Sequence, residues 1–420
     1  IRDQPRSRGL GDVYKRQDYN TAGAQPVIDC QGNGRAFYFG SGETKDSVID
    51  NFIIRNGEVE DTYGGAILCE NNSSPTIRNC VFEDNVVEDW DGVYDNESGG
   101  AIYCDQSSPT ITNCTFSRNR VSGGGTYGGG GAICCYSGSP TVTNCTFSSN
   151  SAWDGGAIYC HTNSSPTITD CTFSGNTAGY GGAICCYCAA PSITGCVFSG
   201  NSATRGYGGG GAIYCNSSDP SVTSCIFNDN EAVDGGAIWC YAGSPTITNC
   251  VFSGNSAILG GAVCCFAASS PTIINCTFNG NIGYRDGGAV FCYGASTVTL
   301  NNSILWGNSA SDGDEVYIYD SGSSCILNYC CVDNTGYGFE PGVPATTIDD
   351  SNNCVFADPR FVNAANGDYH LQSTSPCIDA GDNSLVPSGV DKDLDGNQRI
   401  VDGDNDGTAT VDIGAYEFQP

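Results

Sequence analysis

Short runs of alternating hydrophobic and polar residues recur along most of the chain, and glycine, proline or asparagine separates them. Within residues 165–186 the apolar positions include Ile168, Phe173 and Ile184. The stretch lacks the spacing of an amphipathic helix. We expect three short strands in each repeat, in stretches of the type Thr-Ile-Thr-Asn-Cys-Thr, Phe-Ser-Gly-Asn and Gly-Ala-Ile-Tyr-Cys.

Two motifs, Cys-x-Phe-x-x-Asn and Gly-Gly-Ala-Ile, mark each repeat. The alanine of the second motif recurs every 25 to 35 residues, at Ala66, Ala101, Ala132, Ala157, Ala183, Ala212, Ala237, Ala262 and Ala289. The asparagine of the first motif keeps this interval, at Asn85, Asn119, Asn150, Asn176, Asn201, Asn230, Asn255, Asn281 and Asn308. A period of this kind predicts an all-β right-handed parallel β-helix, a solenoid of about twelve coils over residues 18–334.

The two ends of the chain do not follow the repeat. Residues 1–17 hold five of the sixteen basic residues, and we interpret them as a non-native leader. Residues 335–420 are expected to form a C-terminal cap over the open edge of the last coil, with a loop at 337–353.

The asparagine of each repeat and the segment after it have separate structural roles. Asn176 and its equivalents suit a bend, because asparagine tolerates left-handed geometry and its amide can bond the next coil. The segment between this asparagine and Gly-Gly varies in length and is longest at residues 86–98, 120–129 and 202–209. Insertions on one edge of a solenoid mark either a recognition face or a solvated loop whose length varies without a functional role.

The 27 cysteines fall mostly into two columns. One follows Gly-Gly-Ala-Ile-x, at Cys69, Cys104, Cys135, Cys160, Cys186, Cys215, Cys240, Cys265 and Cys292. The other precedes the phenylalanine, at Cys80, Cys114, Cys145, Cys171, Cys196, Cys225, Cys250 and Cys276. Side chains on in-register strands lie about 4.8 Å apart and parallel, whereas a disulfide needs converging Cβ atoms about 3.8 Å apart. We favour buried thiols over disulfides.

The composition excludes several classes of function. The net charge of −30 repels nucleic acid and anionic lipid. No apolar run approaches the roughly 18 residues of a membrane helix, so we expect no membrane insertion. The only histidines, His161 and His370, leave little basis for a histidine-centred triad or zinc site. We expect a monomer.

Two families resemble parts of the chain. Over residues 63–308 the alternation of Gly-Gly-Ala-Ile with Phe-x-x-Asn resembles the repeats of the polymorphic outer membrane protein family, which are bacterial adhesin-type β-helices. The tail motifs at 367–371, 375–381, 393–397 and 412–417 are similar to the choice-of-anchor Q domain of secreted bacterial β-helix proteins. The resemblance implies secretion and display at the cell surface.

An aromatic stripe is the main binding candidate. Its members flank the buried cysteine of the third strand: Tyr103, Tyr136, Tyr159, Tyr187, Tyr214, Trp239, Tyr241, Phe266, Phe291 and Tyr293. We expect these side chains to face away from the core, where they could stack on sugar rings, bind a partner protein, or simply stabilise the sheet by stacking on one another.

Four acidic residues are the best candidates for catalysis of polysaccharide cleavage. Such enzymes need clustered carboxylates. Asp154, Asp234 and Asp286 each precede a Gly-Gly, with Glu231 nearby. Because they belong to different coils, we do not expect them to converge on a substrate.

A Thr-x-Thr array on the first strand gives a further alternative. It comprises Thr110/Thr112, Thr141/Thr143, Thr167/Thr169, Thr246/Thr248 and Thr297/Thr299. The array resembles the hydroxyl and methyl lattice of ice-binding β-helices, although threonine is also a good outward strand residue.

One acidic stretch predicts Ca²⁺. Asp391, Asp393, Asp395 and Asp402 fit D-x-D-x-D-G with an acidic residue closing the loop, and a second acidic run follows at 402–407. Hard oxygen ligands at alternate positions around a glycine turn are what calcium requires. Asp-Gly turns without calcium are the structural alternative, and the predicted fold requires no cofactor.

Together these observations favour an extracellular or surface-displayed β-helix that binds glycans or cell-surface proteins. A polysaccharide lyase or glycoside hydrolase is the first alternative, and an ice-binding protein is the second.

Overall fold

The computed structural model describes residues 25–89, 99–123, 129–204 and 209–420, so the interpreted leader lies outside the described residues. Apart from four short 3-10 turns, η1 (Asn334–Gly336), η2 (Ala345–Thr347), η3 (Ala364–Asn366) and η4 (Asn383–Leu385), the regular structure there is strand. The chain divides into two compact units, unit 1 (Ile1–Pro191) and unit 2 (Ser192–Pro420). Nothing helical in the described ranges is long and apolar enough to cross a lipid bilayer.

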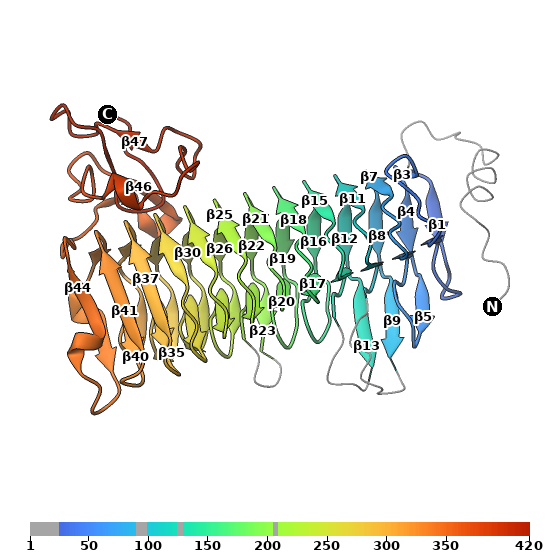
Figure 1. Ribbon diagram of the computed structural model, residues 1–420, viewed down its shortest axis with the longest axis horizontal. Helices are drawn as coiled ribbons and strands as arrows, with labels where there is room; N and C mark the ends of the chain where they lie inside the picture. The colour runs from blue at the N-terminus through green and yellow to red at the C-terminus, as the bar shows by residue number, and fades with distance from the viewer. Residues whose placement is uncertain (1–24, 90–98, 124–128, 205–208) are drawn as a thin grey trace. The chain divides into compact units, whose positions relative to one another are not determined.

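Each unit is a stack of coils, and this confirms the predicted parallel β-solenoid (Figure 1). Successive coils place strands in the same order, which we name sheets 1 to 4. Sheet 1 holds the Thr-x-Thr strands, sheet 2 the phenylalanine strands, sheet 3 a short strand after the asparagine, and sheet 4 the strands after Gly-Gly-Ala. Neighbouring strands are parallel, with register partners such as Phe116 and Phe147.

Unit 1 contributes five or six strands to each of the three main sheets. Sheet 1 holds β3 (Val48–Asp50), β7 (Thr76–Arg78), β11 (Thr110–Thr112), β15 (Thr141–Thr143) and β18 (Thr167–Thr169). Sheet 2 holds β1 (Val27–Asp29), β4 (Ile53–Arg55), β8 (Val81–Glu83), β12 (Thr115–Ser117), β16 (Thr146–Ser148) and β19 (Thr172–Ser174). Sheet 3 holds β5 (Glu58–Glu60), β9 (Val86–Asp89) and β13 (Arg120–Gly123). Sheet 4 holds β2 (Phe37–Phe39), β6 (Ile67–Cys69), β10 (Ile102–Asp105), β14 (Ile133–Tyr136), β17 (Ile158–His161) and β20 (Ile184–Tyr187).

Unit 2 repeats this arrangement. Sheet 1 holds β21 (Ser192–Thr194), β25 (Ser221–Thr223), β29 (Thr246–Thr248), β33 (Thr272–Ile274), β37 (Thr297–Asn301), β41 (Ser324–Asn328) and β44 (Ile348–Asn352). Sheet 2 holds β22 (Val197–Ser199), β26 (Ile226–Asn228), β30 (Val251–Ser253), β34 (Thr277–Asn279), β38 (Ile304–Leu305) and β42 (Cys331–Val332). Sheet 3 holds β23 (Ser202–Ala203), β27 (Glu231–Ala232), β31 (Ser256–Leu259), β35 (Ile282–Asp286) and β39 (Ser309–Asp312). Sheet 4 holds β24 (Ile213–Asn216), β28 (Ile238–Tyr241), β32 (Val263–Phe266), β36 (Val290–Cys292), β40 (Val316–Ile318) and β43 (Tyr337–Phe339).

The strand boundaries differ from the sequence expectation at the two bends that flank each strand of sheet 2. Asn113 and Asp170, between sheets 1 and 2, adopt positive φ values of 55° and 52°, so the chain turns before the cysteine and the strand is Thr-Phe-Ser. At the second bend Gly175 takes the left-handed conformation with φ 61°. The expectation that Asn176 supplies this geometry is wrong, because the side chain of Asn176 is needed inside the coil.

The asparagines of the repeat form a buried ladder between coils. Asn85 Nδ2 donates to Asn119 Oδ1 (2.9 Å), and Asn119 Nδ2 donates both to Asn150 Oδ1 (3.0 Å) and to the Phe82 carbonyl (3.0 Å). The backbone N–H of Asn119 also donates to Asn150 Oδ1 (3.0 Å). This pattern confirms the predicted amide bond to the next coil. It also explains how a fully buried polar residue is tolerated, since its hydrogen-bonding groups have partners.

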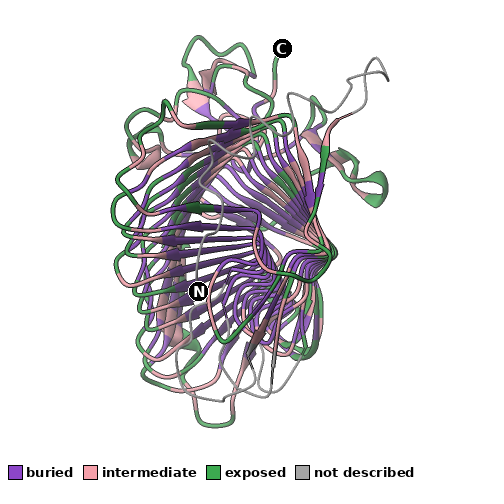
Figure 2. Ribbon diagram, turned by 90° about the vertical axis from the view of Figure 1, so that its right-hand side faces the viewer, coloured by how far each residue is buried: buried purple, intermediate pink, exposed green. Residues whose placement is uncertain are grey.

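The core is built from columns of identical residues. The sheet 2 phenylalanines are fully buried and stack on one another, with ring centroids 4.8 Å apart for Phe82, Phe116, Phe147 and Phe173. Cysteines of sheet 4 lie in register, as Cys104 does with Cys135. The cysteines carry thiols in the structure. Figure 2 shows that the inward parts of the strands are buried and that many exposed residues lie on turns and loops.

In unit 2 the coils continue past the expected boundary at residue 334. Strands β43 and β44 lie in the stretch that was expected to be a loop, and they pair with β40 and β41. The next residues meet the edge of β42, where the Val332 N–H donates to the Val355 carbonyl (3.0 Å).

The remaining residues form two small antiparallel pairs, β45 (Phe361–Asn363) with β46 (Asp368–Leu371) and β47 (Ile400–Val401) with β48 (Thr410–Val411). They pack along the side of successive coils of unit 2 instead of over the end of the last one (Figure 1). The contacts lie at the corner between sheets 1 and 2. There Asn249 Nδ2 donates to the Lys392 carbonyl (2.7 Å), and the Gly414 N–H donates to the Asn302 carbonyl (2.9 Å). The residues that were expected to cap the last coil therefore form a lateral domain. The corner between sheets 1 and 2 provides side-chain amides and apolar residues such as Val251 for the domain to contact.

Replacement of Phe147 by alanine tests the stacked core. Loss of a fully buried ring is expected to lower the free energy of unfolding by about 3–5 kcal/mol. The matched control is Thr146→Ala on the outer face of the same strand, which is expected to change it by about 0.5 kcal/mol or less. Urea unfolding measures both. Equal effects of the two changes would contradict the placement of Phe147 in the core.

Candidate functional site

Half of the predicted aromatic stripe is buried. The residues that precede the sheet 4 cysteine are at most 9% exposed: Tyr103, Tyr159, Tyr214, Trp239 and Phe291. They point away from the core cysteine as predicted. The chain returning from sheet 3, however, crosses the outer face of sheet 4 and covers them. The expectation that these five residues are available to a ligand is therefore wrong.

The cover is made by the residue that precedes Gly-Gly in several coils. Tyr63 stacks on Tyr103 with a centroid distance of 4.5 Å. At Gly129, an added Cβ would overlap the ring of Tyr159. Gly209 has the same relation to Trp239. In two coils the cover is an aspartate next to a cysteine: Asp154 lies near Cys185 and Asp234 near Cys264.

The other half of the stripe is partly exposed and self-stacked. In unit 1, His161 stacks between Tyr136 and Tyr187, at centroid distances of 5.8 and 5.1 Å. In unit 2, Phe266 lies between Tyr241 and Tyr293 at 5.2 and 4.8 Å. Rings stacked in this way present their edges to solvent and cover each other's faces. Stacking of a sugar ring on these faces is therefore disfavoured, and the column stabilises the sheet.

Asp154 is a buried acid in the covering layer of unit 1. Asp154 forms isolated parallel β-bridges with Gly129 and with Tyr180. Its carboxyl group also lies close enough to the Cys185 thiol to act on it electrostatically. Burial raises the pKa of Asp154 to about 7. The structure thus places this residue inside the protein and not in an open site.

Asp234 and Asp286 occupy the same column in unit 2, with Leu259 between them. Burial raises the pKa of Asp234 to about 6, and the charge of Arg285 opposes this rise. Arg285 Nε donates to Asp286 Oδ2 (2.8 Å). Two strand spacings separate the acids by roughly 9–10 Å, and Leu259 occupies the position of the column between them. Glu231 is exposed on β27, in register with Ser256.

Sheet 3 of unit 2 carries an exposed apolar group that the sequence analysis missed. Ile258, Ile282 and Tyr284 are 44%, 40% and 61% exposed, and we call these three residues the sheet 3 patch. They lie on neighbouring strands β31 and β35 and share the outward face. Arg285 lies beside the patch, and Ser311 Oγ donates to the Tyr284 carbonyl (3.1 Å). The alternation of Ile282 and Tyr284 ahead of Asp286-Gly-Gly is the signal that could have identified it.

The predicted insertion edge is only partly visible. Residues 90–98, 124–128 and 205–208 lie outside the described residues. The described residues of the insertions form sheet 3 strands, including β9, β13 and β23. The edge is therefore at least in part regular strand and not an irregular loop.

The Thr-x-Thr array is regular only in part. Thr110, Thr141 and Thr167 are in register in unit 1. The column of the second threonine is interrupted by Arg78, which is the register partner of Thr112. Arg78 Nη2 donates a hydrogen bond to Asp50 Oδ2 (2.9 Å). In unit 2 the predicted pair Thr297/Thr299 is shifted, because Thr299 aligns with Thr272 and Asn301 takes the second position. Thr248, Ile274 and Asn301 in this second column are buried.

The predicted calcium ligands are divided between two places in the lateral domain. Asp393 is buried and accepts backbone N–H groups, including those of Asn397 (2.7 Å) and Glu417 (3.1 Å). Asp395 Oδ2 is bonded to His370 Nε2 (2.7 Å). Asp391 is exposed.

Asp402 belongs to a different acidic group. Its carboxylate oxygen lies within 4.8 Å of those of Asp379 and Asp404, an arrangement that could hold a metal ion. Asp379 Oδ1 is buried without a hydrogen-bond partner in the part of the chain that the structure describes. We propose that these three residues, and not the loop at 391–395, are the ligands of a calcium ion.

A comparison with protein families agrees with the fold. A family profile described as right-handed β-helix region matches four overlapping stretches, residues 29–152, 54–227, 101–278 and 211–383. Among solved structures, tailspike protein 3 of bacteriophage CBA120 is similar, with a TM-score of 0.46 and 14% identity over 79% of this chain and 51% of the tailspike chain. The chain thus spans about half the length of that protein. A search of curated protein sequences finds no match.

Stability should fall with rising pH because of Asp154. Its pKa in the folded protein, about 7, lies above the ordinary value of 3.8, so the stabilisation is complete below about pH 4 and is lost by about pH 7. The loss is on the order of 4 kcal/mol. Asp154→Asn should flatten the profile of urea midpoint against pH between 4 and 7. The exposed turn residue Asp170→Asn is the control, and an unchanged slope in Asp154→Asn would refute the assignment.

Calcium should raise the melting temperature through the acidic group at Asp402. Binding to the folded state alone stabilises it by about 2.7 kcal/mol at a hundredfold excess over Kd. Asp404→Asn should abolish the shift, whereas Asp391→Asn should retain it. The reverse result would favour the loop at 391–395, and no shift in the unaltered protein would exclude calcium at both places.

Proposed function

The chain belongs to the family of right-handed β-helix regions, and from this premise we propose that it is an extracellular binding protein that recognises glycans. The sheet 3 patch of unit 2 is the proposed binding site. Its exposed tyrosine and two isoleucines are the single observation that carries the proposal. Exposed apolar groups rimmed by polar residues mark binding sites on soluble proteins.

The chemistry of the patch suits a sugar. A tyrosine ring offers an apolar face for the C–H groups of a sugar ring, and Arg285, Glu231 and Ser311 supply donors and acceptors for its hydroxyls. A specific protein interface needs about 20–30 residues on each side, whereas only three large apolar side chains are exposed here.

The charge of the chain narrows the class of glycan. A net charge of −30 repels polyanions such as uronate-rich polysaccharides at long range. The arginine at the patch is already paired with Asp286, so it offers little net positive charge. We therefore propose a neutral glycan as the ligand.

Surface display is the second part of the proposal. It is supported by the resemblance of residues 63–308 to polymorphic outer membrane protein repeats and of the tail to a choice-of-anchor Q domain. Both families are found on secreted or surface-attached bacterial proteins.

The two alternatives have less support. For a polysaccharide-cleaving enzyme, the half-buried Asp234 and the buried Asp286 lie in one column with a leucine between them and do not face each other across a groove. For an ice-binding protein, the threonine array is interrupted by Arg78 and is buried at its second column in unit 2.

Binding to an array of neutral glycans tests the proposal. Tyr284→Ala should weaken binding of the best ligand by about tenfold or more, because truncation of a central aromatic contact removes most of the stacking energy. Tyr293→Ala, in the self-stacked column of sheet 4, is the matched control and should change binding by less than about twofold. Isothermal titration calorimetry measures both affinities.

Two results would refute the assignment. If Tyr293→Ala abolished binding and Tyr284→Ala did not, the self-stacked column would be the site. If no neutral glycan bound but a polysaccharide was cleaved, and Asp234→Asn stopped the cleavage, the enzyme alternative would replace the proposal.

A further inference from the structure

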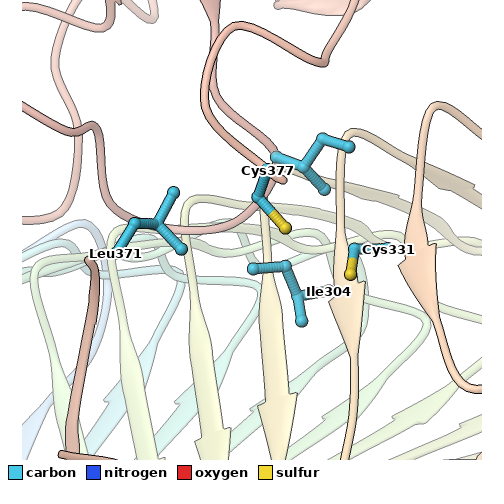
Figure 3. Close-up of a cluster of buried hydrophobic side chains, with 5 residues drawn as sticks. Ile304, Cys331, Leu371 and Cys377 are labelled. Carbon is cyan, nitrogen blue, oxygen red and sulfur yellow. The ribbon is translucent and has the colours of Figure 1, made fainter. Parts of the chain in front are cut away.

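Two cysteines from distant parts of the sequence meet where the lateral domain packs on the coils of unit 2. Cys331 begins β42, and Cys377 lies in a turn after β46. Both are fully buried in one apolar cluster with Ile304, Leu371 and Ile413. Figure 3 shows the two sulfur atoms on the same side of this cluster, next to Ile304.

Cys377 and Cys331 belong to the same buried cluster, and Cys377 lies on a segment outside the four sheets. Together with burial, the Cys377 thiol raises the pKa of Cys331 far above its ordinary value. Cys331 Sγ donates to the Ala357 carbonyl (3.2 Å).

This pair differs from the cysteine columns of the coils. Column neighbours such as Cys104 and Cys135 are register partners on parallel strands, so their side chains run parallel about 4.8 Å apart. A disulfide requires Cβ atoms that converge to about 3.8 Å. Cys331 and Cys377 approach each other from a strand and from a turn, so no strand register prevents their side chains from converging.

We propose that Cys331 and Cys377 form a disulfide that fastens the lateral domain to the coils. One thiol, as its thiolate, attacks a protein or small-molecule disulfide of the surroundings and forms a mixed disulfide. The second thiolate then displaces the remaining thiol. The protein loses two protons and two electrons, and the external disulfide that was attacked is reduced to two thiols.

The bond would change how the lateral domain is held. In the thiol form its attachment beside this cluster depends on contacts such as the hydrogen bonds of Asn302 with Asp382, at 3.1 and 2.9 Å. These break whenever the domain detaches. A disulfide would keep the domain at the corner of sheets 1 and 2 even when such contacts open.

Burial also determines when the bond forms. The docked thiols are inaccessible to an oxidant, and the raised pKa of Cys331 leaves almost no thiolate. Oxidation must therefore occur before docking is complete or during transient detachment. Once formed, the bond is shielded from reductants by the same apolar cluster.

Peptide mapping tests the proposal, because trypsin places the two cysteines in different peptides. Cleavage after Arg285, Arg360 and Lys392 places Cys331 in peptide 286–360 and leaves Cys377 as the only cysteine of peptide 361–392. The full chain is refolded with oxidised and reduced glutathione, alkylated and digested without reductant. Mass spectrometry should find the two peptides linked in most molecules.

Single variants assign the link. Cys331→Ala should abolish it, whereas Cys354→Ala, which removes another cysteine of the same peptide, should retain it. Absence of the link in the unaltered protein, or its persistence in Cys331→Ala, would overturn the proposal.

A second readout tests the role of the bond. The rate of chymotrypsin cleavage within the lateral domain should fall by roughly tenfold or more on oxidation of the unaltered protein, because detachment is suppressed. In Cys377→Ala, whose small apolar side chain preserves the cluster, oxidation should leave the rate unchanged. Equal rates for the oxidised and reduced unaltered protein would refute the fastening role even if the link forms.

Discussion

In-register pairing of parallel strands is the constraint on which the rest of the structure depends. Because equivalent residues lie directly above one another, each position of the repeat becomes a column, and each column must be able to stack on itself. Phenylalanine does so through its rings, and asparagine does so through amide hydrogen bonds to both neighbours. The repeat therefore uses residues that pair favourably with a copy of themselves.

A second layer inside each coil explains why so little of the aromatic stripe is accessible. The residue before Gly-Gly lies over sheet 4, as Gly129 lies over Tyr159, where an added Cβ would overlap the ring. In this layer burial raises the pKa of Asp154 to about 7 and that of Asp234 to about 6, so Asp154 makes stability depend on pH. Three of the four acids that the sequence offers as catalytic candidates, Asp154, Asp234 and Asp286, lie in this layer.

The most exposed large hydrophobic residue of the described chain lies where the repeat is least strict. Strand β35 is the longest of sheet 3 in unit 2 and carries Tyr284, the most exposed of the large hydrophobic residues that the structure describes. The lateral domain occupies another irregular region, a corner of the coils. There Asn302 forms a hydrogen bond with the domain and Ile304 packs against it. Both features follow from departures from the repeat, since a strict repeat can present only uniform columns.

The sequence by itself determined the solenoid, its cysteine and asparagine columns and the inward set of residues, because the positions of Phe147 and Asn150 recur with the period of the coil. It also indicated correctly that the aromatic residues beside the cysteines point away from the core. Only the tertiary structure decided that Tyr159 is covered while Tyr284 is exposed. Only the structure decided that Asp402 lies with Asp379 and that Cys377 meets Cys331. These relations join segments that no local period links, and so they depend on how the covering layer and the lateral domain fold back onto the coils.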